Sequence, residues 1–345
     1  MASYTQLPID SFKSSPLANY IDLANSKLGS KVVAVSDEFF AAASNMLNPK
    51  PSVREANKFI ETGAWFDGWE TRRHNPDHDW AIIQLAFAGS IVGFDIDTAH
   101  FTGNHAPVAS VDVAFVSSEA LEKGGDINYE WKEVLPKVEL QPTSKHYFVL
   151  DNPDNTPYNF VRINQYPDGG IARFRVYGSI VPIFPEDKNE LVDLAYVGNG
   201  ARVVVSSNDH FSPASNVILP TRGENMGDGW ETKRSRTPGH IDYLIVKLGA
   251  PGRLERAIFD TLHFRGNFPA QASLEACSSQ EENPDNDPAA NQEGFWTTIS
   301  PKQKTAADVE HEWDLTPKDK VFTHVRATLY PDGGFKRLRV YGYRA

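Results

Sequence analysis

The apolar segments of this chain mostly follow the two-residue period of β-strands. Alternation of apolar and polar side chains places one set on each face of a sheet, whereas the apolar face of a helix repeats about every 3.6 residues. The segments that alternate, or that are short apolar runs typical of buried strands, are 80–85, 108–116, 160–164, 172–177, 243–248 and 325–329. Long segments with a helical period are few. The pattern therefore predicts an all-β fold.

Turns rich in glycine and proline separate these segments. Tyr-Pro-Asp-Gly-Gly occurs at 166–170 and at 330–334, each time between the last two strands predicted in its half of the chain. Proline restricts φ and glycine tolerates positive φ, so we expect a hairpin turn at both places. Many short strands joined by such turns are typical of a β-sandwich. A closing Arg-Val-Tyr-Gly strand suits the jelly-roll form of that sandwich.

Four groups of motifs occur twice and in the same order, which indicates an internal duplication. The pairs are Ser36–Phe40 with Ser207–Phe211, Asp67–Thr71 with Asp228–Thr232, Asp97–Asn104 with Asp260–Asn267, and Tyr166–Gly178 with Tyr330–Gly342. The copies lie about 160 to 170 residues apart, far beyond the roughly 20–50 residues of a solenoid repeat. We therefore predict two tandem jelly-roll β-sandwich domains.

The motifs also give the expected domain boundaries. Residues 1–28 precede the first motif without a visible counterpart, so we expect them to form an N-terminal arm. The first repeat is expected at 29–180 and the second at 193–345. Prolines interrupt regular structure between them, and we expect 181–192 to be the linker. The chain of 345 residues is long enough for two domains that each bury a core.

Charge narrows the set of partners. Lys and Arg number 34 against 45 Asp and Glu, so the formal net charge is −11, and the chain has no basic run. Such a surface repels nucleic acid and anionic lipid, so we expect neither as a partner. No apolar stretch approaches the roughly 20 residues that a membrane-spanning helix needs.

The single cysteine, Cys277, cannot form an intramolecular disulfide, as expected of a protein from a reducing compartment. Its place in an alternating segment predicts a buried, unreactive thiol rather than a nucleophile. The first residues lack a basic head followed by an apolar run, and the last residues are not a Ser-Lys-Leu signal. We therefore expect a cytoplasmic protein.

The first candidate site is the motif Gly63–His74, which concentrates charges and aromatic rings without a strand or helix period. Glu70 offers a carboxylate for proton transfer, and Arg72 and Arg73 can bind an anion. The alternative is a structural corner in which Trp69 fills the core and the charges pair with one another. Both interpretations stay open, because paired charges are often structural.

The second candidate site is Asp97–Pro107, which contains Asp97, His100 and Asn104. Positions 97 and 100 face opposite sides of a regular strand, so only a bend could bring these two side chains together. His100 is matched in the second repeat by His263. A histidine in an apolar strand is more often a satisfied core residue than a ligand.

No cofactor or metal motif is present. His74, His78, His100 and His105 fall in the first repeat, but their spacing fits no known metal-binding pattern, and Pro76 prevents a regular helix between the first two. Nucleotide-binding glycine loops and the nucleophile elbow are absent too. We expect no cofactor, with a divalent metal left as an open alternative. From the residues alone, a duplicated β-sandwich is as typical of a binding module as of an enzyme.

Four stretches resemble the allantoicase family closely: Thr62–Asn75, Asp97–Pro107, Tyr166–Arg175 and Asp228–Arg236. The resemblance extends from about Gly29 to Gly342. It implies two jelly-roll repeats of the galactose-binding-like type and a homo-oligomer, a hexamer being typical of the family. It also implies a hydrolase acting on C–N bonds of linear amidines. That enzyme converts allantoate into (S)-ureidoglycolate and urea in purine and allantoin degradation for nitrogen use.

The resemblance suggests roles for the polar residues. Allantoate carries one carboxylate and two ureido groups, so loss of urea requires an anion clamp and proton transfer. The residues expected to be catalytic are His100, Glu70 and Asp97. The residues expected to bind substrate are Arg72, Arg73, Trp69, Asn104, Arg234, Arg236, Glu231 and His263.

Two other functions stay open. One is a non-catalytic carbohydrate- or ligand-binding sandwich in which Trp65 and Trp69 stack on the ligand, and the other is a hydrolase of a related ureide such as ureidoglycolate. The sequence does not decide whether one repeat or both carry a site, or whether the site lies at a repeat or subunit interface. The repeats differ where Lys233 replaces Arg72 and where Arg236 replaces an asparagine.

Overall fold

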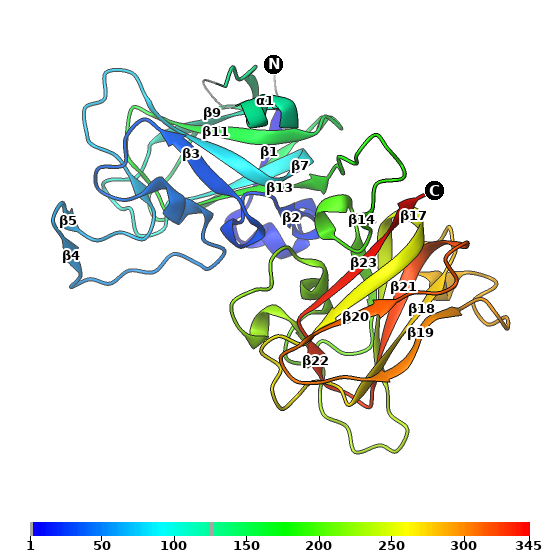
Figure 1. Ribbon diagram of the computed structural model, residues 1–345. Helices are drawn as coiled ribbons and strands as arrows, with labels where there is room; N and C mark the ends of the chain where they lie inside the picture. Colours follow the sequence, from blue (N-terminus) through cyan, green and yellow to red (C-terminus); the bar gives the residue numbers. More distant parts are fainter. Residues whose placement is uncertain (1–2, 124–126) are drawn as a thin grey trace. The chain divides into compact units, whose positions relative to one another are not determined.

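The structure is a computed structural model that describes residues 3–123 and 127–345, and it divides between Val181 and Pro182 into two compact units (Figure 1). Each unit is built mainly of antiparallel strands. Within the described residues the one α-helix is α1 (Ser118–Lys123), and no helix there is long and apolar enough to cross a membrane. The 3-10 helices are η1 (Ile9–Ser14), η2 (Pro16–Asn19), η3 (Ser26–Leu28), η4 (Ala43–Leu47), η5 (Val197–Asn199), η6 (Ala214–Ile218), η7 (Met226–Asp228) and η8 (Pro284–Asn286).

One long strand, β7, organises the first unit because it belongs to both sheets of the sandwich. The strands of this unit are β1 (Tyr4–Leu7), β2 (Ile21–Asp22), β3 (Lys31–Val35), β4 (Phe59–Ile60), β5 (Gly63–Ala64), β6 (Trp69–Glu70), β7 (Asp79–Asp97), β8 (Val108–Ala114), β9 (Lys132–Glu139), β10 (Lys145–Leu150), β11 (Tyr158–Tyr166), β12 (Gly170–Ile171) and β13 (Arg173–Ile180). The first half of β7 pairs with β3 and β11, and β11 leads on to β8 and β9. Its second half pairs with β10 and β13, which β1 and β2 extend.

The second unit repeats this order around β17. Its strands are β14 (Val192–Asp193), β15 (Arg202–Ser206), β16 (Trp230–Glu231), β17 (Asp242–Asp260), β18 (Gln271–Cys277), β19 (Thr297–Lys304), β20 (Glu310–Asp314), β21 (Val321–Tyr330), β22 (Gly334–Phe335) and β23 (Arg337–Arg344). β17 pairs first with β15 and β21 and then with β20 and β23, as β7 does with its own neighbours. The prediction of two tandem jelly-roll β-sandwiches is confirmed.

The first repeat begins earlier than the predicted residue 29. β2 pairs with β13 as β14 pairs with β23. Each of these short strands leads into a 3-10 turn that ends at a glycine with positive φ, Gly29 at 113° or Gly200 at 88°. Residues 21–28 therefore have a counterpart at 192–199, and the arm without a counterpart ends at residue 20. The sequence carries a short signal for this match, because Asp22-Leu23-Ala24 recurs as Asp193-Leu194-Ala195.

The two Tyr-Pro-Asp-Gly-Gly segments are not hairpin turns, contrary to the prediction. β11 and β13, the strands on either side of the first one, do not pair with each other but with different halves of β7. β21 and β23 relate to β17 in the same way. Each segment carries the chain from one sheet to the other, with Gly169 and Gly333 at positive φ. The residue types of a turn were recognised correctly, but the strands that it joins were not.

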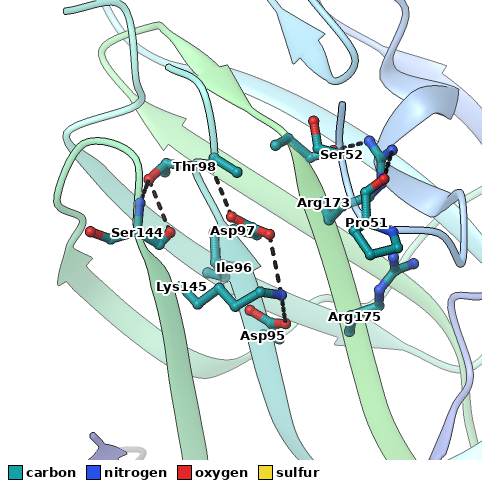
Figure 2. Close-up of polar contacts among 12 residues, drawn as sticks. Pro51, Ser52, Asp95, Ile96, Asp97, Thr98, Ser144, Lys145, Arg173 and Arg175 are labelled. Carbon is teal, nitrogen blue, oxygen red and sulfur yellow. Dashed lines mark hydrogen bonds and ion pairs between the residues drawn. The ribbon is translucent and has the colours of Figure 1, made fainter. Parts of the chain in front are cut away.

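A buried arginine ties the loop around Pro51 to the closing strand of the first unit (Figure 2). The side chain of Arg173 is 2% exposed, and its guanidinium donates to the carbonyls of Lys50, Pro51, Asp67 and Ala172 over 2.7–3.3 Å. It also pairs with the Asp67 carboxylate at 2.6 Å. Asp67 is therefore a partner in the scaffold of the motif in which it lies.

The second unit keeps the backbone part of this anchor. Arg337, the counterpart of Arg173, is also buried. Its guanidinium donates to the carbonyls of Pro220, Thr221, Asp228 and Lys336. Because both repeats retain the arginine and its carbonyl partners, the anchor belongs to the fold rather than to a site found in one repeat.

A buried carboxylate, Asp95, lies on β7 beside Asp97 and Lys145 (Figure 2). Lys145 Nζ is 3.3 Å from Asp95 and 3.2 Å from Asp97, and Asp95 Oδ1 has no hydrogen-bond partner among the described residues. Burial raises the pKa of Asp95 to about 7, and Lys145 opposes this only in part. The strand register places Ile258 at the same position of the second repeat, opposite Arg339.

Arg173→Met should lower the free energy of unfolding by about 3–5 kcal/mol, because the buried carbonyls and the Asp67 carboxylate lose their donor. Urea denaturation measures the loss. Arg202→Met is the matched control, since that side chain is 62% exposed and pairs with Glu282 at the surface. It should cost less than about 1 kcal/mol. Equal losses in the two variants would contradict the anchoring role.

Asp95→Asn should change how stability depends on pH. The folded protein holds a proton on Asp95 up to a pKa of about 7, whereas the unfolded chain releases it near the ordinary value of 3.8. Wild-type stability should therefore fall relative to Asp95→Asn between pH 5 and pH 7, by up to about 1.4 kcal/mol per pH unit. Urea denaturation at pH 5, 6, 7 and 8 gives the two curves. Asp319→Asn, an exposed control, should run parallel to wild type, and a parallel Asp95→Asn curve would refute the prediction.

Candidate active site

A pair of two-residue strands positions Glu70. β6 pairs antiparallel with β12, which sets Glu70 opposite Gly170. A Cβ atom at position 170 would lie 2.2 Å from the ring of Phe101, so the space beside this strand admits only glycine. Trp69 has no exposed surface, and its indole N–H donates to the carbonyl of Asp37 at 2.8 Å. Trp69 therefore fills the core and presents no face on which a substrate could stack.

Four polar side chains meet here, and we call them the Glu70 cluster: Glu70, Arg73, Asn104 and Asp168. The Asn104 amide donates to Glu70 Oε1 at 2.8 Å, and Arg73 Nη2 lies 3.4 Å from the same oxygen. Arg73 Nη1 donates to Asp168 at 3.0 Å, and its Nη2 donates to the Asn104 carbonyl at 2.9 Å. The structure thus brings together Glu70, Arg73 and Asn104, which the sequence singled out, with Asp168, which it did not.

The Glu70 carboxyl has the properties of a proton-transfer group. Glu70 is 7% exposed, and burial raises its pKa, while hydrogen bonding from Asn104 and the charge of Arg73 oppose that rise. Both of its hydrogen bonds fall on Oε1, and Oε2 has no partner among residues 3–123 and 127–345. A carboxyl with a raised pKa and one open oxygen can hold a proton and pass it to a bound molecule.

Asp168 connects the charged end of the motif Gly63–His74 to the turn between the two sheets. It accepts hydrogen bonds from Arg73 and from the backbone N–H of Asn75, the latter at 3.1 Å. From sequence alone, the Tyr-Pro-Asp-Gly-Gly segment predicts only a turn. The sequence nevertheless holds a signal for a further role of this aspartate. Both copies of the segment contain it, at 168 and 332, although a turn requires only the proline and the glycines.

The second unit builds the same arrangement, which we call the Glu231 cluster: Glu231, Arg234, Asn267 and Asp332. The Asn267 amide donates to Glu231 Oε1 at 2.7 Å, and Arg234 Nη1 donates to Asp332 at 3.0 Å. In the described part of the chain Arg234 forms no ion pair with Glu231. The side chain of Arg234 is 56% exposed, whereas that of Arg73 is 34% exposed. The Glu231 cluster is therefore the more open of the two.

Asp97 and His100 have other partners. The chain bends as their spacing requires, with His100 at a φ of 71°. The Asp97 carboxylate accepts from the N–H of Ala99 at 2.8 Å and faces Lys145 (Figure 2). His100 Nε2 instead lies 3.1 Å from the carbonyl of Ser52. The bend therefore leaves Asp97 beside β10 and His100 beside the loop that contains Ser52.

The remaining predicted binding residues have separate surroundings. Arg72 contacts Asp37 through its backbone N–H at 2.7 Å, Nε at 2.8 Å and Nη2 at 2.7 Å. Partial burial alone would raise the pKa of Asp37, but these hydrogen bonds hold it below its ordinary value. His263 has a φ of 70°, and its N–H donates to Asp308. Arg236 is exposed and forms no ion pair with any residue that the structure describes.

Other features lie away from these clusters. Among the described residues no group of three or more His, Cys, Asp and Glu side chains is arranged to hold a metal ion. A cavity of about 320 Å³ in the first unit, lined in part by Lys132, Asp154 and Tyr158, contains none of the predicted site residues. Cys277 is buried, as predicted, and burial raises its pKa to about 12.

Comparisons with known proteins place this architecture in a family. The family model named Allantoicase repeat matches residues 21–181 and 192–345. The allantoicase of Neurospora crassa is 46% identical over 99% of this chain and 96% of its own length, and that of Saccharomyces cerevisiae is 44% identical over 94% of each. The crystal structure of Saccharomyces cerevisiae allantoicase covers 99% of this chain and 100% of that chain, with a TM-score of 0.76 and 39% identity. With both repeats matched and nearly its full length shared, this chain belongs to the allantoicase family.

Proposed function

We propose that this protein hydrolyses allantoate to (S)-ureidoglycolate and urea, a step of purine and allantoin degradation that releases nitrogen. The Glu70 cluster is the observation that supports this most directly, because a buried carboxyl with a raised pKa contacts a guanidinium and an amide. These groups stand in a chain that belongs to the allantoicase family over nearly its whole length. A module that only binds sugars would need no such proton-transfer group.

The reaction replaces a carbon–nitrogen bond of allantoate by a carbon–oxygen bond. One ureido nitrogen leaves the central carbon, takes up a proton and departs as urea. Water supplies the hydroxyl group that the carbon gains, and its other proton goes to the protein. The site must therefore supply an acid for the leaving nitrogen and a base for the water. One carboxyl can serve in both steps, because it gives up a proton in the first and recovers one in the second.

The roles follow from the contacts within the Glu70 cluster. We assign Glu70 as the acid and then the base, since its Oε2 meets no protein donor in the described structure. Arg73 and Asn104 are assigned to the carboxylate and ureido groups of the substrate, for which a guanidinium and an amide have matching hydrogen-bonding groups. Asp168 positions Arg73 through the 3.0 Å ion pair.

Asp97 and His100 are assigned a supporting role in this proposal. Asp97 accepts from the N–H of Ala99, and His100 Nε2 contacts the carbonyl of Ser52. The two side chains therefore hold the backbone before and after the motif Gly63–His74. Such residues affect turnover through the position of the loop, whereas Glu70 would affect it through proton transfer.

We also infer that the protein acts in the cytoplasm as a homo-oligomer, of hexameric size by resemblance to its family, without nucleic acid or membrane partners. The net charge of −11 and the single buried cysteine support the compartment and the absence of such partners. Proton transfer is assigned to side chains alone, without a cofactor. Light scattering measures the oligomer size.

One assay separates this function from its alternatives. The pure protein is incubated with allantoate, with and without a chelator, and urea and ureidoglycolate are measured. Equal amounts of both products are expected. Binding without product would identify a ligand-binding protein, and turnover of ureidoglycolate alone would identify a hydrolase of a neighbouring ureide. Loss of activity with the chelator, restored by a divalent metal, would reassign part of the chemistry to that metal.

Glu70→Gln should lower kcat for urea release by at least about 10²-fold, because the amide keeps the shape of the side chain but cannot transfer a proton. KM should change far less. Wild-type turnover should fall as pH rises through the raised pKa of Glu70, because the protonated form is the acid. The residual activity of Glu70→Gln should lack this fall.

Glu55→Gln is the control for this experiment. Glu55 is an exposed carboxylate of the same repeat, paired with Lys58, and its replacement should leave turnover unchanged. Circular dichroism establishes that both variants are folded. A folded Glu70→Gln protein with near-normal kcat would remove Glu70 from the mechanism.

A further inference from the structure

The Glu231 cluster has different charged neighbours from the Glu70 cluster. Asn208 stands where the first repeat has Asp37, and its uncharged side chain accepts the backbone N–H groups of His210, at 2.9 Å, and of Lys233, at 3.2 Å. Lys233 is the counterpart of Arg72, whose guanidinium Asp37 neutralises through contacts of 2.7 and 2.8 Å. No ion pair is formed by the Lys233 side chain within the described ranges. Asp37 neutralises Arg72 in the first repeat, whereas the charge of Lys233 in the second repeat can still pair with a bound anion.

A second available cation follows three positions later. Arg236 replaces an asparagine of the first repeat, is exposed, and has no ion-pair partner in the part of the chain that the structure describes. The backbone between the two cations is fixed, because the N–H of Ser235 donates to Asp332 at 2.7 Å. Arg265 adds little, since Asp308 lies 4.0 Å from it. Two exposed positive charges without an ion-pair partner among the described residues therefore lie two and five positions after Glu231 in the chain.

The cluster also keeps groups that can bind a neutral amide. Glu231 Oε1 accepts from Asn267, and Oε2 has no hydrogen-bond partner among the described residues. The Arg234 guanidinium is held by Asp332 and the Gly266 carbonyl but is more than half exposed. A carboxylate can therefore meet cations here while a ureido N–H meets the open oxygen of Glu231.

We propose that the Glu231 cluster, together with Lys233 and Arg236, is a second ligand site in each chain and binds a small ureido carboxylate through its anionic group. The ligand class rests on the proposed function, whereas the preference for an anion rests on the charges of the second repeat. This site selects a carboxylate more strongly than the Glu70 cluster does, because Asp37 neutralises Arg72 in the first repeat.

Titration calorimetry with hydantoate tests the proposal, because that compound carries one carboxylate and one ureido group. Wild-type protein should bind two hydantoate molecules per chain, and Arg234→Ala and Arg73→Ala should each leave one. The double variant Lys233→Ala/Arg236→Ala should weaken binding at the second site about tenfold, as expected for two exposed charge contacts. It should not change binding of the uncharged amide of hydantoate. Lys320→Ala, an exposed charge just before the opposite end of β21, is the matched control.

The outcomes separate this inference from the proposed function. One hydantoate per chain in wild type, unaffected by Arg234→Ala, would overturn the second site. Two sites with undiminished affinity in the folded double variant would overturn the role of the two cations. Failure of the proposed function looks different, because allantoate would then yield no urea while hydantoate still bound at two sites. Circular dichroism shows which variants are folded.

Discussion

The backbone pairing of Glu70 with Gly170 is the constraint on which the candidate site depends. It brings the motif near the start of the repeat against the turn before its last strand, so side chains far apart in sequence share one cluster. Position 170 admits only glycine, because the ring of Phe101 fills the space that a Cβ atom would occupy. The second repeat makes the same pairing between Glu231 and Gly334. A polar cluster at this point is therefore a consequence of the fold.

Asp67 and Glu70, the two carboxylates of the motif Gly63–His74, have different uses because their partners differ. Asp67 meets a buried guanidinium in a 2.6 Å ion pair, and the same arginine also satisfies several carbonyls, so this carboxylate belongs to the scaffold. Glu70 receives one amide hydrogen bond and the edge of Arg73, and burial raises its pKa. Removing the Asp67 partner should therefore affect folding, whereas changing Glu70 should affect chemistry. Two carboxylates only three positions apart in one motif can thus serve stability and function separately.

Periodicity and repetition were enough to predict the all-β fold and its duplication, because the strand period and the repeated motifs are both properties of short stretches of sequence. They could not show that β7, a strand of 19 residues, belongs to both sheets. The middle of β7 is apolar on both faces, so the alternation that would mark one continuous strand is interrupted there. The hairpin prediction failed for a related reason, because turn chemistry does not reveal which strands pair. In the site, Glu70, Arg73 and Asn104 were found from composition, whereas Asp168 was hidden inside a turn motif. Pairing between distant segments decides these points, and local sequence does not carry it.

Duplication keeps the contacts that the fold needs and leaves the surface charges free to diverge. The arginine that anchors the closing strand, the core tryptophan and the glutamate–asparagine contact occur in both repeats. Near the two clusters, the charge differences fall outside the core, where Asn208 replaces the partly buried Asp37 and the exposed Arg236 replaces an asparagine. A site built twice on one scaffold can in this way acquire two preferences from a few surface substitutions. The geometry places the reacting groups, and the charges around them decide which ligand each repeat favours.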